Sequence, residues 1–379
     1  MIYLDNAATT WPKPKEVAEA VVACMEAVPG TPGRGSHQGA RQAARIVFEA
    51  REEVAGLFGV DDATRIAFCA NATQALNTAL FGLLQPGDVV LTSSWEHNAV
   101  VRPLHVLEQQ GVIVRKIPSS QDGPLDLAML EAALPEAKAL VLTHASNVTG
   151  AILPIQEAAA LAAQSGCLVI VDAAQTAGVE EMQASWGLHI IAFAGHKGLM
   201  GPQGTGGLYV APDVSVKPLL FGGTGSRSEE REQPSFYPDC LESGTLNTPG
   251  LAGLLAGVRF VRTTGLEAIR CRESAFAETL RAALRTMPGI HMKGEKTGQL
   301  QTAVLSFTVE GMDSSAAALW LEEKAGIICR AGLHCAPWAH EALGTLATGT
   351  IRLSPGYFNT SEEIAEAVRA IQYLAKQDK

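Results

Sequence analysis

The sequence predicts an α/β fold in which a mainly parallel β-sheet is covered by helices on both faces. Short, strongly apolar segments alternate with helical patterns through the first two thirds of the chain, and turn-forming or polar residues follow several of these segments directly. The chain has 379 residues, which is long enough for two or three domains.

Seven segments have the length and apolar character of buried strands. They cover residues 65–69, 89–92, 112–117, 139–143, 167–172, 190–194 and 206–210. Helical patterns occupy 73–84 and 154–164, between neighbouring strands. Strands joined in this way by helices run parallel in one sheet.

The composition changes at residues 222–249, which are rich in Gly, Ser, Pro and charge and predict a long irregular segment. Loops of this length are usually functional or disordered. A long helical pattern follows at 251–287, and then a strand near 303–307. We therefore expect a domain change near residue 250. The expected division is a large domain at 15–250 and a smaller α+β domain formed by 1–14 and 251–379.

The formal net charge is −10, which argues against nucleic acid and anionic membranes as partners. The N-terminal residues have no basic start followed by an apolar run, and no apolar stretch reaches the ~18 residues of a membrane span. The seven cysteines are scattered and predict neither a disulfide framework nor a metal site. A cytoplasmic location is expected.

Two polar residues follow buried strands in a way that predicts a chemical site. Asp172 ends one strand, and Lys197 stands in a Gly-rich turn after another. Open α/β sheets place ligands at this strand edge. A lone Asp there is more often a turn former or helix cap. The pair, however, suggests a Schiff-base lysine and the acid that faces a pyridinium nitrogen, because a carboxylate favours the protonated ring.

An anion site is predicted where the strand at 65–69 runs into the helix at 73–84. Free backbone N–H groups and the Thr73 hydroxyl at this helix N-terminus could bind a phosphate. Alone, the same residues describe an ordinary helix cap. The combination with Asp172 and Lys197 gives the anion site its weight.

At this point the sequence resembles the fold-type-I, class V aminotransferase-like enzymes, which use pyridoxal 5′-phosphate, and within them the SufS-like (group II) cysteine desulfurases. The resemblance runs nearly end to end, and the order and spacing of its motifs make it specific. The motifs are YLDNAAT (3–9), RGSHQ (34–38), NATQALN (71–77), EHNA (96–99), SNVTG (146–150), VDAAQT (171–176), GHKG (195–198), ESGTLN (242–247), RAGLHCA (330–336) and IRLS (351–354).

The resemblance implies roles around the cofactor ring. Lys197 would carry the cofactor, and Asp172 would face the ring nitrogen. His97 would stack on the ring and help in proton transfer, although without the family pattern it could equally cap a helix or pair with Glu96. Gln175 would bind the phenolic oxygen, and Asn147 would bind that oxygen or the substrate carboxylate.

The resemblance also implies how the phosphate is held. Thr73, the Ala72 backbone and His196 would bind it, and Thr245 would reach the phosphate of a neighbouring subunit, so that the site belongs to a homodimer. The family usually has Ser where this chain has Ala194, which predicts one hydrogen bond fewer to the phosphate.

Cys335 decides the reaction that the resemblance implies. It lies among turn-forming residues, with His334 and Arg330 nearby, and cationic surroundings favour the thiolate. Arg330 and Arg352 would bind the substrate, with Arg352 clamping its carboxylate through a bidentate pair. A surface Arg is the alternative for Arg352, but its place in the otherwise apolar IRLS strand argues against that interpretation. We interpret Cys329 as structural, and expect four further cysteines to be buried small hydrophobes: Cys24, Cys69, Cys167 and Cys271.

The predicted function is conversion of L-cysteine to L-alanine, with a persulfide formed on Cys335 for transfer to an acceptor protein, for example in iron–sulfur cluster assembly. Selenocysteine lyase activity, with L-selenocysteine as substrate, is the nearest alternative. An aminotransferase or epimerase on the same scaffold is the second. A non-catalytic protein that binds the cofactor is the third.

Overall fold

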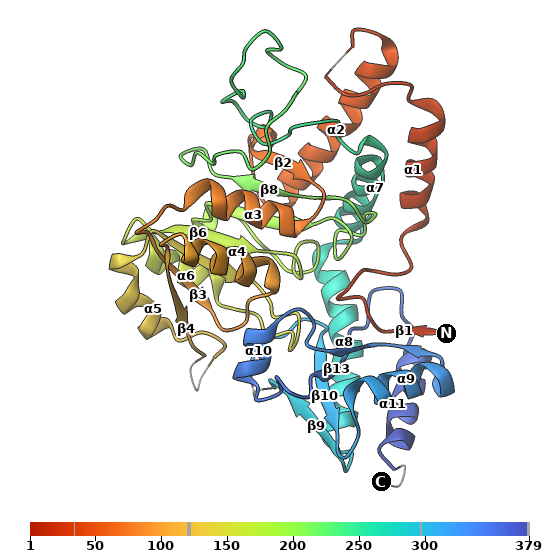
Figure 1. Cartoon of the computed structure of the whole chain (residues 1–379). Coiled ribbons are helices and arrows are strands. Elements are labelled where there is room, and N and C mark those ends of the chain that lie inside the picture. Colours follow the sequence, from red (N-terminus) through yellow and green to blue (C-terminus); the bar gives the residue numbers. More distant parts are fainter. Residues whose placement is uncertain (34, 120–122, 296–297, 377–379) are drawn as a thin grey trace.

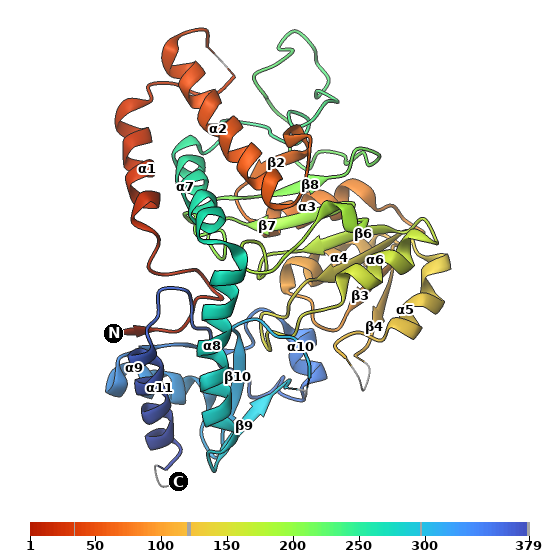
Figure 2. The ribbon, with the colours of Figure 1, turned by 180° about the vertical axis from the view of Figure 1, so that it is seen from behind.

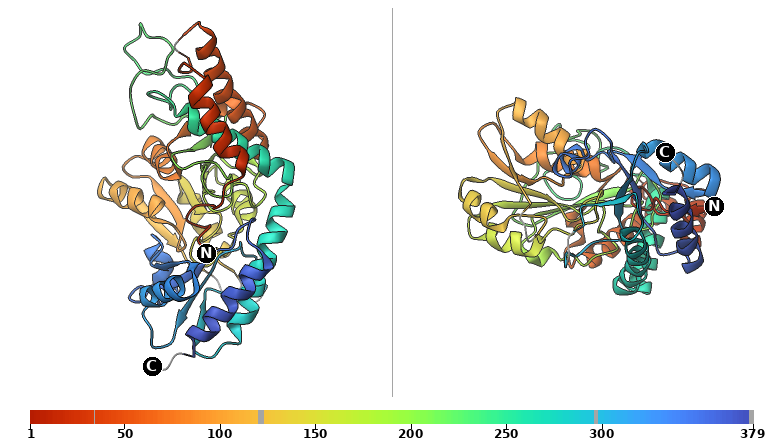
Figure 3. Two further views of the ribbon diagram at one scale, coloured as in Figure 1. Left: turned by 90° about the vertical axis from the view of Figure 1, so that its right-hand side faces the viewer. Right: turned by 90° about the horizontal axis from the view of Figure 1, so that it is seen from below.

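The computed structural model describes residues 1–33, 35–119, 123–295 and 298–376. Arg34, the first residue of the RGSHQ motif, lies outside the described residues. Figure 1 shows a larger part that contains the long sheet and, below it, a smaller part that contains both chain ends. The side view in Figure 3 shows that the molecule is elongated, with the smaller part at one end.

All seven predicted strand segments form one sheet in the larger part, with the order β2-β8-β7-β6-β5-β3-β4. Strand β8 is antiparallel to both neighbours, and the other pairs are parallel. The central strands are buried throughout because helices cover both faces. The strands are β2 (Ile66–Cys69), β3 (Val89–Ser93), β4 (Ile113–Ile117), β5 (Ala139–Thr143), β6 (Leu168–Asp172), β7 (Ile190–Ala194) and β8 (Gly206–Val210).

Helices pack on this sheet as the alternating pattern predicts. Figure 1 shows α3 and α4 on the near face, and Figure 2 shows α6 on the opposite face. The helices of the larger part are α1 (Lys15–Ala27), α2 (Gln38–Leu57), α3 (Ala72–Leu83), α4 (Asn98–Gln109), α5 (Leu127–Ala133), α6 (Ile155–Ala163) and α7 (Thr248–Thr264). Short 3₁₀ turns lie at η1 (Ala63–Arg65), η2 (Leu134–Glu136) and η3 (Ala184–Trp186).

The smaller part has its own core around an antiparallel sheet of order β12-β13-β10-β9. The N-terminal strand pairs in parallel with β11, which ties the start of the chain to this part. Its elements are β1 (Ile2–Tyr3), α8 (Leu266–Arg285), β9 (Ile290–Lys293), β10 (Leu305–Val309), α9 (Ser314–Ala325), β11 (Ile327–Ile328), β12 (Arg330–Gly332), α10 (Pro337–Ala342), β13 (Thr350–Leu353) and α11 (Ser361–Leu374).

The long helical pattern at 251–287 forms two helices rather than one. Gly265, with a φ of 89°, separates α7 from α8, because this left-handed conformation ends α7 and suits glycine. Helix α7 packs against α1 and α2 and contributes Leu254 and Val258 to the core of the large sheet. We therefore propose that the change of domain falls at Gly265, about one helix beyond residue 250.

Residues 222–247 contain no helix or strand, and Thr248 and Pro249 begin α7. Figure 1 shows this loop at the same end of the molecule as the start of α2. This agrees with the irregular segment predicted from composition. Among the described residues, no helix combines the length and the apolar character that crossing a bilayer requires.

Candidate active site

A cavity of about 230 Å³ lies where the carboxyl ends of β5, β6 and β7 meet the smaller domain. It brings together all the predicted site residues except Thr245, although motifs as far apart as 72 and 352 supply them. The predicted residues that line it are Ala72, Thr73, His97, Asn147, Asp172, Gln175, His196, Lys197, Arg330, Cys335 and Arg352. The candidate active site therefore lies at the carboxyl edge of the sheet, where open α/β folds bind their ligands.

Lys197 stands in the turn that follows β7. Burial lowers the pKa of its amine to about 8, and the negative charge of Asp172 opposes this change. The turn is closed by hydrogen bonds from Met200 N to the Lys197 carbonyl (2.8 Å) and from Gly201 N to the Gly195 carbonyl (2.7 Å). A buried amine with a lowered pKa is neutral in an appreciable fraction of molecules near neutral pH, as a nucleophilic lysine must be.

Asp172 ends β6 and is only 3% exposed. Burial raises the pKa of its carboxyl, while the hydrogen bond from Ala174 N (2.9 Å) and the charge of Lys197 lower it. A bound cation beside this carboxylate would replace the water that it has lost. The position therefore suits the protonated ring nitrogen that the sequence predicted for it.

His97 caps helix α4, because its Nδ1 accepts a hydrogen bond from Ala99 N at 3.0 Å. Burial, reinforced by the positive charge of Lys197, lowers the pKa of the ring to about 4. The ring is therefore neutral at neutral pH and carries its proton on Nε2. The capping and cofactor interpretations of this residue are compatible, since one nitrogen caps the helix while the ring lines the cavity.

The N-terminus of α3 supplies the predicted anion site. Asn71 caps the helix by accepting from Gln74 N at 2.9 Å. The backbone N–H groups of Ala72 and Thr73, in the same first turn, have no hydrogen-bond partner among the described residues. A side chain at Gly206 would place its Cβ 2.7 Å from the Asn71 Cα, and this close contact fixes the helix end against β8. Free N–H groups of this kind bind phosphate.

Cys335 occupies a tight turn that the larger domain holds in place. Both His334 and Cys335 have positive φ values, 49° and 56°, which are costly for residues other than glycine. Their carbonyl oxygens accept from Asn147 Nδ2 and from Asn98 N, both at 2.7 Å. Asn147, expected to contact cofactor or substrate, thus also positions the cysteine turn.

The expectation that His334 adds positive charge beside Cys335 is wrong. Burial lowers the pKa of His334 to about 2, and the charge of Arg352 lowers it further, so the ring is neutral. Its Nε2 lies 3.0 Å from Thr350 Oγ1, which makes it a packing residue of the turn. Positive charge near Cys335 therefore comes from the guanidinium groups of Arg330 and Arg352, which line the cavity together with Lys197.

Arg352 lies on β13 and is 2% exposed. Its Nη2 donates to Asp5 at 2.7 Å and its Nη1 to the Asn147 carbonyl at 3.0 Å. The surface reading is therefore excluded. Arg330 is the register partner of Arg352 on the neighbouring strand, so two guanidinium groups flank the place where a substrate carboxylate would bind.

Two carboxyl groups had no site role predicted from the sequence. Asp5 pairs with Arg352, and Glu96, considered above only as a partner for His97, is fully buried. Burial raises the pKa of Glu96 to about 8, and its Oε1 is hydrogen bonded to Ser93 Oγ (2.5 Å) and Thr143 N (3.0 Å). A neutral Glu96 adds no negative charge that would repel the Asp172 carboxylate. Both residues belong to quoted motifs, YLDNAAT and EHNA, but their partners come from distant strands.

Four lining residues carry a buried polar atom that has no partner among the described residues. These atoms are Asn147 Oδ1, His196 Nδ1, His334 Nδ1 and Arg352 Nε. Buried polar groups are normally hydrogen bonded. Together with the free N–H groups of α3, the unpartnered atoms fit a polar, anionic molecule that would occupy the cavity.

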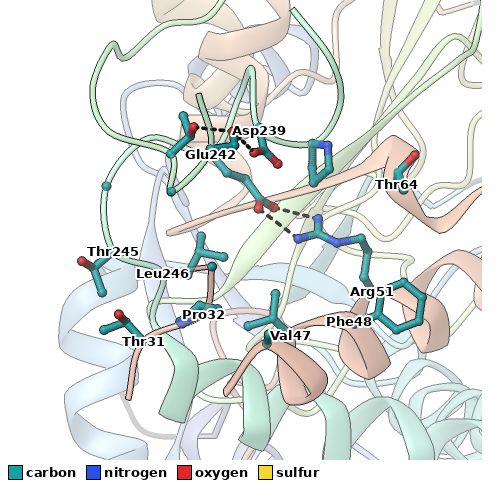
Figure 4. Close-up of a pocket in the computed structure, with 17 residues that line it drawn as sticks. Thr31, Pro32, Val47, Phe48, Arg51, Thr64, Asp239, Glu242, Thr245 and Leu246 are labelled. Carbon is teal, nitrogen blue, oxygen red and sulfur yellow. Dashed lines mark hydrogen bonds and ion pairs between the residues drawn. The ribbon is translucent and has the colours of Figure 1, made fainter. Parts of the chain in front are cut away.

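Thr245 lies elsewhere, beside a second cavity of about 390 Å³ that is shown in Figure 4. Its predicted contact with a phosphate is therefore absent within one chain. At the floor of this cavity Arg51 and Glu242 form a buried ion pair with two hydrogen bonds, of 2.7 and 2.9 Å, and Phe68 N donates to Glu242 at 2.6 Å. Glu242 thus fastens the irregular segment to α2 and β2.

Replacing Glu242 with Ala is expected to lower the free energy of unfolding by about 3–5 kcal/mol, because Arg51 would be left buried and unpaired. The control is Glu230→Ala in the same segment, whose ion pair with Arg227 is exposed and should contribute at most about 1 kcal/mol. Urea unfolding measures both values. Equal losses in the two variants would show that the buried pair does not hold the segment.

The other cysteines agree with expectation in all but one case. Cys24 and Cys167 are buried, and Cys69 and Cys329 are partly buried against the two cores. Cys271 is exposed on α8, which corrects its interpretation as a buried hydrophobe. Its sequence neighbours face solvent because this side of the helix points away from the core.

Comparisons with known proteins agree with this geometry. The family model for class-V aminotransferases matches residues 2–366. A probable cysteine desulfurase of Methanothermobacter thermautotrophicus is 36% identical over 99% of this chain and 94% of its own length. A cysteine desulfurase structure from Thermococcus onnurineus has a TM-score of 0.92 at 30% identity and covers 99% of this chain and 94% of its own.

The cysteine desulfurase CsdA of Escherichia coli, solved in an S-sulfonic acid form, has a TM-score of 0.87 at 30% identity and covers 98% of this chain and 94% of its own. The family match at residues 2–366 spans both domains and all the residues that line the cavity, and the chain belongs to the class-V aminotransferase family.

Proposed function

We propose that the protein is a pyridoxal-phosphate-dependent cysteine desulfurase that forms a persulfide on Cys335. The observation that carries the proposal is the arrangement of the cavity, where Cys335 faces the same space as Lys197, Asp172 and Arg352. The names of its relatives support the same reaction.

The residues of the cavity fit pyridoxal phosphate. Lys197 would bind it covalently, Asp172 would hold the proton on its ring nitrogen, and the N-terminus of α3 with His196 would bind the phosphate. Ala194 offers the phosphate no side-chain donor. When bound, the cofactor withdraws electrons from the substrate Cα.

Hydrogen bonds within the protein limit the roles that Gln175 and His97 can play toward the cofactor. Gln175 Nε2 donates to the Ala7 carbonyl at 3.1 Å, so its second amide hydrogen would serve the phenolic oxygen. Neutral His97, which carries its proton on Nε2, would stack on the ring and donate a hydrogen bond from Nε2.

The chemistry of Cys335 follows from its place in the cavity. Arg352 and Arg330 would bind the carboxylate of L-cysteine, and Lys197 would take the Cα proton. The Cys335 thiolate then attacks the substrate sulfur, so that an S–S bond forms as the substrate C–S bond breaks. The electron pair of the C–S bond would stay with the substrate, so that Cβ gains a proton, Cα regains the proton that Lys197 removed, and L-alanine leaves. This requires the thiolate within ~3–3.5 Å of the sulfur, in line with the breaking bond.

Product analysis tests the proposal against its alternatives. The loaded enzyme, given L-cysteine and a thiol reductant, should release alanine and sulfide in equal amounts. A keto acid would identify an aminotransferase, and racemised substrate an epimerase. A yellow protein without turnover on any amino acid would identify a non-catalytic binding protein. Faster turnover of L-selenocysteine, independent of Cys335, would favour the lyase.

A second protein must collect the sulfur, because a persulfide on Cys335 blocks the next turnover. Cys335 is exposed and therefore accessible to the thiol of an acceptor protein, such as one that serves iron–sulfur cluster assembly. The scattered cysteines support the reducing cytoplasm as the place of this exchange.

We also propose a homodimer in which Thr245 reaches the cofactor phosphate of the partner subunit. Phe48, which lines the cavity of Figure 4, is 50% exposed, and Leu220 and Phe221, which come directly before the irregular segment, are 53% and 74% exposed. An exposed apolar surface of this kind usually belongs to an interface. A second copy of the chain would cover it.

Thr245→Val is expected to weaken cofactor binding about tenfold, because one hydrogen bond to a charged phosphate would be lost. The control is Thr224→Val, which lines the same cavity and bonds to Ser226. Spectroscopic titration with cofactor measures the affinities, and light scattering the mass. A fully active monomer would contradict the shared site.

A further inference from the structure

The carbonyl of His196, the residue before Lys197, accepts three hydrogen bonds from the N-terminal segment 9–13. The donors are Thr10 N (3.1 Å), Thr9 Oγ1 (3.1 Å) and Lys13 Nζ (2.6 Å). Thr10 Oγ1 also donates to the carbonyl of Lys197 at 2.8 Å. A segment that is remote in sequence thus fixes the peptide on which the cofactor lysine stands.

Lys13 differs from the other donors because it carries a charge. It is partly buried and forms no ion pair with any described residue. Burial lowers the pKa of its ammonium to about 8, and its positive charge helps to lower the pKa of His196. A partly desolvated cation without an acidic partner is costly for the fold unless an anion binds nearby.

The residues directly before the segment 9–13 are held by the smaller domain. Asp5 accepts from Arg352 at 2.7 Å, and Ala7 N donates to Ser354 Oγ at 2.9 Å. The segment is therefore fixed on both sides of the cavity. Lys13 Nζ is thus held 2.6 Å from the carbonyl oxygen of His196, whose residue lines the cavity together with Thr73 at the N-terminus of α3.

We propose that Lys13 is a positioning residue for the cofactor: it orients the His196–Lys197 peptide and supplies an unpaired positive charge behind His196 that attracts the cofactor phosphate. This inference rests on the proposed function, since it requires pyridoxal phosphate at Lys197. It adds to that proposal a source of phosphate affinity outside the cavity lining. The added charge also offers a compensation for the hydrogen bond that Ala194 does not supply.

The test measures cofactor affinity by titrating cofactor-free protein with pyridoxal phosphate and, separately, with pyridoxal, which lacks the phosphate. Lys13→Met should weaken binding of pyridoxal phosphate about tenfold, the size expected for one charge at moderate distance and effective dielectric. Binding of pyridoxal should change far less. Lys13→Arg keeps the charge and a donor and should restore most of the affinity.

Lys15→Met is the matched control, because Lys15 lies two residues further on, is exposed and pairs with Glu19. It should leave both affinities unchanged. Hydrogen exchange at Met200 and Gly201, whose N–H groups close the lysine turn, should be faster in cofactor-free Lys13→Met than in Lys15→Met.

Two results overturn the inference in different ways. Equal losses for pyridoxal and pyridoxal phosphate would show that Lys13 acts on the fold alone. Unchanged affinities in Lys13→Met would show that it has no role toward the cofactor. If the unmodified protein binds no pyridoxal phosphate at all, the proposed function itself fails, and this outcome is separate from the other two.

Discussion

Lys197→Ala is expected to abolish covalent attachment of the cofactor and to lower turnover by about 10³-fold or more, because the nucleophile and the base for the Cα proton are removed together. In the unmodified protein, Lys197 lines the cavity together with Asp172, and burial lowers the pKa of its amine to about 8. Cofactor would still bind through the contacts to its phosphate.

Borohydride reduction followed by peptide mapping checks the attachment. In the unmodified protein the label should appear on Lys197 alone, and in Lys197→Ala it should disappear. Lys217→Ala, at an exposed position, serves as the control and should behave like the unmodified protein. A label on any other lysine would reject the assignment and, with it, the roles of Asp172 and His97 relative to the ring.

Cys335→Ser should leave cofactor binding intact and lower alanine production from L-cysteine at least about 10³-fold, since a serine hydroxyl is a poor nucleophile toward sulfur. The turn should keep its shape, because its hydrogen bonds use the carbonyl oxygens of His334 and Cys335. Release of selenium from L-selenocysteine should survive, because the C–Se bond is weaker.

Cys271→Ser provides the control for Cys335→Ser, as the second exposed cysteine among the described residues. It should retain full activity with both substrates. If Cys335→Ser converts cysteine as fast as the unmodified protein, the desulfurase reaction proposed here is wrong, and another reaction of the same scaffold applies.

The central strands were predictable because their residues are almost all apolar, whereas β4 contains Arg115 and Lys116. The segments 139–143, 190–194 and 206–210 form strands with these same bounds, since each is buried on both faces. The break at Gly265 was not predicted, because a single glycine within an apolar helical pattern does not show which conformation it adopts. The packing of α7 on α1 likewise depends on surfaces that meet only in the folded chain.

The motifs predicted most of the residues that line the cavity, but they did not predict which of these residues carry a charge. His334 stands beside Cys335 in sequence and suggests a positive charge there, but burial makes the ring neutral. Lys13 and Asp5 occupy an N-terminal segment whose sequence gives no hint of a contact with Lys197 or Arg352. These contacts form because the N-terminal segment passes between the two domains. A local sequence pattern gives no information about such a long-range contact.

Single-turnover mass spectrometry of Cys335 tests the central claim most directly. The loaded enzyme is mixed with one equivalent of L-cysteine without reductant, quenched by alkylation and digested. The account predicts one added sulfur atom on the peptide that contains Cys335, in proportion to the alanine formed, and none on the peptide that contains Cys271. Alanine without added sulfur on Cys335, or sulfur on a different cysteine, would contradict it.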